Sequence, residues 1–137
     1  MMYSQRGAAQ YASVRKHGLV ANASPTRLVQ IMYEQILAEL ATAQGCMERI
    51  KDNMPLPAVI AKVKAVDKAF RLINHLDSTL DLERGREVAA NLHSLYGYML
   101  TQLTMANAHN DGAILAEISA LVRKVKSGWD QIVSDQQ

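Results

Sequence analysis

The stretch SPTRLVQIMYEQILAELATAQGCMERI, residues 24–50, decides the fold class of this chain. Its apolar residues recur at spacings of four and three, the pattern of one apolar stripe along a helix. The stripe consists of Leu28, Met32, Ile36, Leu40, Ala43, Met47 and Ile50. Ser24 is a typical N-cap, and Pro25 suits the first helical position because an N–H there would have no partner. Since the residue before a proline avoids helical geometry, we expect a helix over 24–52 that ends ahead of Pro55.

Three further stretches have the same period and predict helices at 57–80, 84–108 and 111–134. Pro57 can open the first of these and Asp111 can cap the last. The second predicted helix would bury Ile60, Val63, Val66, Phe70, Ile73, Leu76 and Leu80. The third would bury Val88, Leu92, Leu95, Met99, Leu103 and Ala106. The fourth would bury Ile114, Ile118, Leu121, Val125, Trp129 and Ile132.

The composition supports an all-α fold in one domain. The chain has 137 residues, 49% of them hydrophobic, with only seven Gly and three Pro. Because short connections place consecutive helices antiparallel, residues 23–137 are expected to form an antiparallel up-down four-helix bundle. Residues 1–22 show little periodicity and are expected to form a mobile N-terminal arm.

The charge distribution argues against nucleic acid as a partner. Three of the 15 basic side chains lie in residues 1–23, and the rest nearly balance the 13 acidic ones. Phosphate contacts need clustered Lys and Arg on one face, which this near-neutral body lacks. The single cysteine and the absence of a cleaved signal favour a cytoplasmic protein. Cys46 falls among apolar positions, where a buried free thiol is the simplest interpretation.

The third predicted helix contains a long stretch without charge. Residues 88–110 contain no Asp, Glu, Lys or Arg. Polar residues are spread through this stretch, so it does not predict a membrane-inserted segment. Two interpretations stay open: this helix is the most central one in the bundle, or its outward face, with Gly97 beside Tyr98, is covered at times by another chain.

Metal and catalytic chemistry have little support. No Glu-x-x-His pair occurs, and the four histidines lack short ligand spacing, so no metal or other cofactor is expected. Arg86 and His93, with six residues between them, resemble the motif of a family of small helical ribonucleases. Glu87 would repel the phosphate of such a substrate, and no basic surface accompanies the pair.

Taken in order, a larger set of residues resembles the FliS-type flagellar secretion chaperones, which hold flagellin before export. The matching residues are Tyr11, Ala23-Ser24-Pro25, Leu28, Met32-Tyr33-Glu34, Leu80-Asp81-Leu82-Glu83-Arg84-Gly85, Glu87, Asn91-Leu92, Leu95-Tyr96, Tyr98-Met99, Leu103, Ala106-Asn107, Asp111 and Trp129. They span nearly the whole chain. Arg86 stands where the family commonly has a second Gly, so we expect a less tightly turned entry to the third helix. Thr101 and Gln102 replace residues that are often basic in the family.

The resemblance implies binding and no enzymatic activity. The implied client is the C-terminal segment of flagellin, which is disordered in the monomer, and the complex would be delivered to the flagellar type III export gate. Such a client would become ordered on binding, and its docking should resemble that of an amphipathic helix in a hydrophobic groove. The residues expected to contact it are Tyr11, Asn91, Tyr96, Tyr98, Leu100 and Asn107. Tyr11 could instead staple the arm to the bundle, and either asparagine could cap local structure.

Two other functions stay open beside the flagellin chaperone. One is a generic bundle adaptor for another amphipathic helix, which the apolar pattern alone does not distinguish from a flagellin chaperone. The other is a helical ribonuclease that uses Arg86 and His93.

Overall fold

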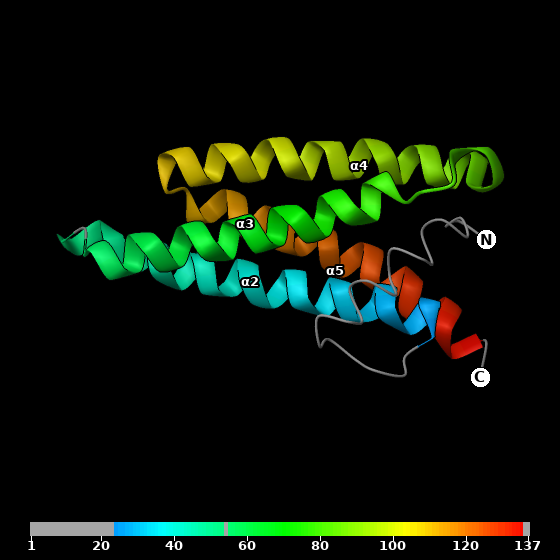
Figure 1. The fold of residues 1–137 in the computed structure, drawn as a ribbon, viewed down its shortest axis with the longest axis horizontal. Helices are drawn as coiled ribbons and strands as arrows, with labels where there is room; N and C mark the ends of the chain where they lie inside the picture. Colours follow the sequence, from blue (N-terminus) through cyan, green and yellow to red (C-terminus); the bar gives the residue numbers. More distant parts are fainter. Residues whose placement is uncertain (1–23, 54, 136–137) are drawn as a thin grey trace.

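Four long helices make up the described chain (Figure 1). The computed structural model describes residues 24–53 and 55–135, without the side chain of residue 52. The helices are α2 (Pro25–Asn53), α3 (Leu56–Ser78), α4 (Leu82–His109) and α5 (Gly112–Asp135). The predicted arm, and Tyr11 within it, lie outside the described residues.

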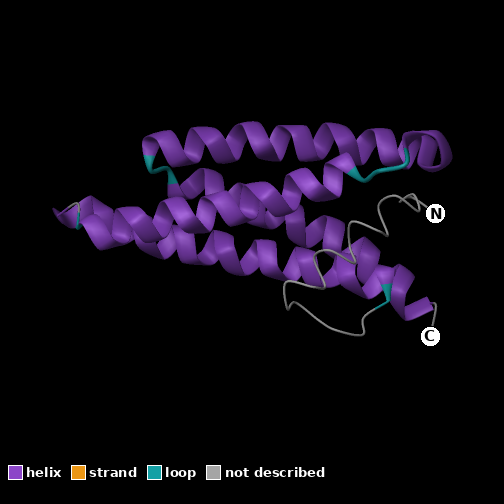
Figure 2. Cartoon of the chain, viewed as in Figure 1, coloured by secondary structure: helices purple, strands orange, loops and turns teal. Residues whose placement is uncertain are grey.

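The helices form an antiparallel bundle, as predicted (Figures 1 and 2). Each helix packs on the next along the chain, and α5 returns to pack on α2, so that α2 and α4 lie diagonally opposite. The start of α2, the start of α4 and the end of α5 lie at one end of the bundle (Figure 1). The arrangement leaves the outer sides of α3 and α4 next to each other along one face.

Side-chain caps fix where three of the helices begin. The Ser24 Oγ accepts a hydrogen bond from the Arg27 N–H at 3.2 Å, which confirms the predicted cap of α2. The Asp111 Oδ1 accepts from the Ala113 N–H at 3.0 Å and so caps α5, again as predicted. Helix α4 begins at Leu82, earlier than the predicted 84, because the Asp81 carboxylate accepts from the Arg84 N–H at 3.0 Å.

The entry to α4 is sharply turned at Arg86. This residue has φ 48° and ψ −123°, which are non-helical values inside α4. Residues with a Cβ rarely adopt this conformation, whereas glycine adopts it easily. The expectation of a less tightly turned entry is therefore wrong: the chain makes a glycine-type turn with an arginine.

The α2 stripe forms the centre of the core. All seven of its predicted apolar residues are buried, and Cys46 beside them is a buried free thiol, as predicted. On α5, Trp129 is buried and its Nε1 donates to the carbonyl oxygen of Thr26 at 2.8 Å. This bond joins the end of α5 to the start of α2.

The predicted stripe of α3 is partly wrong. Ile60, Val63 and Phe70 were expected in the core, but they are 48%, 48% and 37% exposed. The residues that α3 buries are Ala58, Lys62, Ala65, Val66, Ala69, Ile73 and Leu76. The alanines are small enough for α3 to lie close to α2, so the helix turns this side inward and leaves the larger side chains outside.

Two other predicted core residues are exposed. Val88 is 60% exposed while the next residue, Ala89, is buried, so just after the turn at Arg86 the helix directs Ala89 and not Val88 into the core. Ile132, 42% exposed, lies in the last turns of α5, beyond the buried Trp129.

Candidate functional site

A row of exposed apolar side chains runs along the outer side of α3. Leu56, Ile60, Val63 and Phe70 follow one another at spacings of four, three and seven residues, so they lie on one face of the helix. Single exposed apolar residues are normal on a protein surface, whereas a contiguous row indicates an interaction site. We call these four residues the α3 row.

The α3 row borders a groove between α3 and α4. The groove has a volume of about 220 Å³ and is lined by Val63, Val66, Asp67, Phe70, Thr104 and Asn107. Asp67 is the one charged residue among these six, and it pairs with Arg71 at 3.0 Å. The α3 side of the groove is therefore apolar apart from Asp67, and the α4 side is neutral.

The α4 wall of the groove carries neutral polar groups. The Thr104 hydroxyl donates back to the Leu100 carbonyl oxygen at 3.0 Å, so its methyl group remains available for contact. The Asn107 Oδ1 is buried, and no described residue hydrogen-bonds to it.

Outside the groove, the surface of α4 continues without charge. Ser94 and Thr101 are exposed, and a Cβ added at Gly97 would meet nothing within 4 Å. Open space beside Gly97 allows another backbone to approach α4 closely. The charge-free stretch thus includes a solvent-facing surface, which favours the second interpretation of that stretch over a helix buried on all sides.

Polar contacts join α3 to α4 at one end of the groove and again beyond its other end. At one end the Lys62 Nζ donates to the Asn107 carbonyl oxygen at 3.0 Å and to the Asn110 Oδ1 at 2.7 Å. Further along the two helices, beyond Phe70, the His93 Nδ1 and the Asp77 Oδ1 lie 2.6 Å apart. The groove therefore lies between two fixed points.

The structure separates the residues that were expected to contact a client. Leu100 is half-buried against the core, and Asn107 lines the groove. Tyr98 is 46% exposed but lies at the α4–α5 edge, where its hydroxyl donates to Glu117 on α5. This hydrogen bond raises the pKa of Tyr98 above its ordinary value, with smaller contributions from burial and from the negative charge of Glu117. Asn91 is exposed one heptad before Tyr98 and shares its edge.

The expectation that Tyr96 contacts a client does not fit the position of its side chain. Its side chain is 1% exposed, and its hydroxyl lies 2.5 Å from the hydroxyl of Tyr33 on α2. The bond crosses the core along the bundle diagonal. A tyrosine can be buried when its hydroxyl has a partner, and Tyr33 provides one here. In this structure Tyr96 is a core residue.

Sequence reasoning missed the α3 row as a surface. The signal that could have found it is a second stripe in the same helix. Ala58, Ala65 and Ala69, continued by Ile73 and Leu76, repeat at helical spacing on a different side from the α3 row. Two stripes make the apolar arc of α3 wider than one core contact requires, so one of them must face outward.

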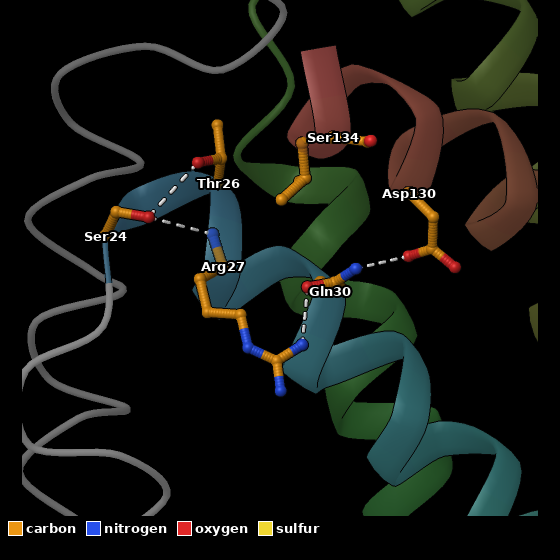
Figure 3. A pocket seen from close by; sticks show the side chains of 7 residues that line it. Ser24, Thr26, Arg27, Gln30, Asp130 and Ser134 are labelled. Atoms are coloured by element: carbon orange, nitrogen blue, oxygen red, sulfur yellow. Dashed lines mark hydrogen bonds between the residues drawn. The ribbon is translucent and has the colours of Figure 1, made fainter. Parts of the chain in front are cut away.

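A larger cavity, lined mostly by polar residues, lies elsewhere (Figure 3). It has a volume of about 630 Å³, at the bundle end where α2 begins and α5 ends. Its lining residues are Ser24, Thr26, Arg27, Gln30, Asp130, Val133 and Ser134. Figure 3 shows Gln30 bonded to both Arg27 and Asp130 across this region. Hydrogen bonds from Lys126, and to a smaller extent from Gln30, lower the pKa of Asp130. The polar side chains of Arg27, Gln30 and Asp130 at this cavity are thus already hydrogen-bonded to one another.

Metal and catalytic groupings are not evident in the described residues. Within 24–53 and 55–135, no three His, Cys, Asp or Glu side chains come together in a way that could hold a metal ion. His93 is held by Asp77, while Arg86 occupies the turn at the start of α4. In the same part of the chain, no helix has the length and apolar character needed to span a bilayer.

Comparison with known proteins gives consistent matches over nearly the whole chain. Residues 7–136 match the family model described as "Flagellar protein FliS". The chain is 41% identical over 131 residues to flagellar secretion chaperone FliSB of Pseudomonas aeruginosa, covering 96% of this chain and 98% of that protein. It is 34% identical over 132 residues to flagellar secretion chaperone FliS of Salmonella typhimurium, covering 96% and 93%.

A solved structure has the same fold. It is described as a flagellar chaperone from bacteria and superposes with a TM-score of 0.71, covering 93% of this chain and 98% of its own. The sequences are only 12% identical, so this likeness concerns the fold alone.

Proposed function

The chain belongs to the FliS family of flagellar secretion chaperones, and from this premise we propose that it binds the C-terminal segment of flagellin in the cytoplasm. Bound there, the segment is kept from polymerising until the complex is delivered to the flagellar type III export gate. The observation that carries this proposal is the α3 row, which lies beside a groove whose α4 wall bears no charge.

The surface suits an apolar segment that orders on binding. An amphipathic helix laid along the groove would place its apolar side on Val63 and Phe70 and its flank on Thr104 and Asn107. Ordering a disordered client consumes part of the binding energy, which allows a large contact to form and still be released. A chaperone that hands its client to an export apparatus requires this combination.

The lack of charge on α4 serves repeated covering and uncovering. An unpaired charge on this surface would lose its hydration each time the client bound, at a cost of several kcal/mol. Hydroxyl and amide groups lose less, and they can exchange water for the polar groups of the client. Thr104 and Asn107 on the groove side and Ser94 and Thr101 further out are of this kind.

A long client can continue from the groove across α4. Leu100 and the open surface beside Gly97 lead from the groove toward the α4–α5 edge. There Tyr98 and Asn91 offer a ring and an amide to the same chain. In this proposal Tyr96 packs beneath this surface of α4, and Tyr11 in the N-terminal arm makes a further contact with the client.

The proposal is tested with flagellin from the same cell. Purified chaperone is mixed with full-length flagellin and with flagellin that lacks its C-terminal segment, and complex formation is measured by size-exclusion chromatography with light scattering. The proposal is supported if the chaperone forms a complex with full-length flagellin but not with the truncated one, and if it slows the growth of flagellin filaments. Equal binding of both proteins, or of neither, contradicts it.

The generic adaptor differs in selectivity. An adaptor for any amphipathic helix would bind unrelated amphipathic peptides as tightly as the flagellin segment, because apolar burial alone would decide its affinity. The flagellin chaperone should prefer its client by at least about tenfold, the effect of roughly one well-placed polar contact. Competition between the two kinds of peptide for labelled flagellin segment separates these outcomes.

A further inference from the structure

Lys62 is an unusual residue in this bundle. It is the only charged residue that is buried among those described, with 6% of its surface exposed. Its Nζ donates to the carbonyl oxygen of Asn107 and to the Oδ1 of Asn110. Among the described residues, no carboxylate lies within ion-pair distance of this ammonium group. Both of these bonds go to the C-terminal end of α4.

The end of α4 can accept a positive charge. The last carbonyl groups of a helix lack intrahelical partners and carry the negative end of the helix dipole. Asn110 ends α4 in the left-handed conformation, with φ 50° and ψ 45°, and the Asp111 N–H bonds back to the Ala106 carbonyl oxygen at 3.0 Å. Lys62 adds a charge-assisted cap from the neighbouring helix.

Stability alone is a weak reason for a lysine at this position. A buried charge loses its hydration, and an apolar side chain of similar size often replaces it without loss of stability. An apolar side chain cannot provide directional contacts, and without them α3 and α4 can slide along each other. The two hydrogen bonds of Lys62 fix the axial position of α3 relative to α4 at this end of the groove.

The same contact fixes the groove. Lys62 adjoins Val63 in the chain, and Asn107 accepts the lysine's hydrogen bond while also lining the groove. The α3 wall and the α4 wall are therefore joined directly at this end of the opening. Asp77 and His93 join the same helices further along.

We propose that Lys62 is a positioning residue for client binding, which holds the α3–α4 groove at the width and register that the client fits. This inference rests on the proposed function. A groove held in its binding shape avoids the cost of ordering its walls when the client arrives. Without the Lys62 contacts, the end of α4 can move relative to α3, and part of the binding energy is used to restore the groove.

The first test compares two lysines that lie two positions apart. Lys62→Met keeps a long apolar side chain and removes both bonds, whereas Lys64→Met removes an exposed lysine. Isothermal titration with the flagellin C-terminal segment should give about tenfold weaker binding for Lys62→Met and unchanged binding for Lys64→Met. The proposal would be overturned if Lys62→Met bound the segment as tightly as the wild type. It would also be overturned if the loss of binding were no larger than the fraction of the variant that is unfolded.

The second test removes the acceptor and keeps the fold. Asn110→Gly suits the left-handed conformation and deletes the Oδ1 that Lys62 reaches. Its melting temperature should change little while its affinity for the segment falls, and Asn110→Asp, which restores an acceptor, should recover the affinity. Equal binding by wild type and Asn110→Gly overturns the role of Lys62 but leaves the proposed function intact. If the wild type itself fails to bind the segment, the proposed function fails instead.

Discussion

The hydroxyl groups of Tyr33 and Tyr96 lie 2.5 Å apart inside the bundle, and each side chain is 1% exposed. They belong to α2 and α4, the helices that lie diagonally opposite. The bond therefore joins two helices across the full width of the core and ties α4 to α2, the helix with the most regular apolar stripe.

Removing this bond should lower stability without changing client affinity. Tyr96→Phe keeps the ring and deletes one buried hydroxyl, so the free energy of unfolding should fall by about 1 kcal/mol. The double variant with Tyr33→Phe should lose less than the sum of the single losses, because both substitutions remove one shared bond. Denaturant titrations measure the stability and client titrations the affinity. If a folded Tyr96→Phe variant bound the client more weakly, Tyr96 would instead have a role in client binding.

Replacing Arg86 by glycine should stabilise the protein. Its φ of 48° and ψ of −123° lie in a region that side chains rarely adopt, and such strain costs on the order of 1–3 kcal/mol. Arg86→Gly relieves the strain but leaves the unfolded chain more flexible, so we expect a net gain of about 1 kcal/mol. Arg84→Gly, in the first turn of α4, should destabilise by about the same amount. Thermal unfolding of both variants checks the prediction, and a lower melting temperature for Arg86→Gly would contradict it.

Asp130 should make stability depend on pH in the acid range. Hydrogen bonds from Lys126 and then Gln30 lower the pKa of this carboxylate in the folded protein. A lowered folded pKa gives stability that is present above the unfolded value of about 3.9 and is lost as pH falls through the folded value. The wild type should thus exceed Asp130→Asn in stability near neutral pH, and the difference should shrink at acid pH. Lys126→Met should behave like Asp130→Asn, and a difference that does not change with pH would count against the assignment.

A charge placed on the neutral wall of the groove should weaken client binding. Thr104→Lys puts an ammonium group where the client is proposed to lie, and its desolvation should reduce affinity by at least about tenfold. The matched control is Thr42→Lys on the outer side of α2. Thr42 and Thr104 are both exposed, and each hydroxyl donates to the carbonyl oxygen four residues earlier. Titration of both variants with the flagellin segment should show the loss for Thr104→Lys alone.

The sequence predicts the fold well where one stripe dominates. Helix α2 has a regular apolar stripe between a Ser-Pro start and a proline after its end, and all seven residues of that stripe are buried, although α2 also buries Val29, Ile31 and Tyr33. Helix α3 has two stripes, and the pattern alone favoured the bulkier one. The alanine stripe is buried because it allows close approach to α2, which is a property of the pair of helices and not of either sequence alone.

The site residues were harder to assign for a related reason. On α4, Tyr96 and Tyr98 both border the predicted core stripe, and a rotation of the helix by part of a turn decides which one is buried. In the structure Tyr96 is the buried one, and its hydroxyl meets that of Tyr33, which lies 63 positions away in the chain. Asn107 was expected to contact a client from the family resemblance, and it lines the groove, whereas only the packed structure tells which of the two α3 stripes forms the surface beside it.

The most direct test of the proposed site is titration of Val63→Glu with the C-terminal segment of flagellin, beside Ile132→Glu as a control. Val63 belongs to the α3 row and Ile132 lies on α5, and they are similarly exposed, at 48% and 42%. The wild type and Ile132→Glu should bind equally, with the negative heat-capacity change of apolar burial. Val63→Glu should bind at least about tenfold more weakly while its unfolding stays cooperative. Binding of Val63→Glu with the affinity of the wild type would contradict the account and place the client on another face of the bundle.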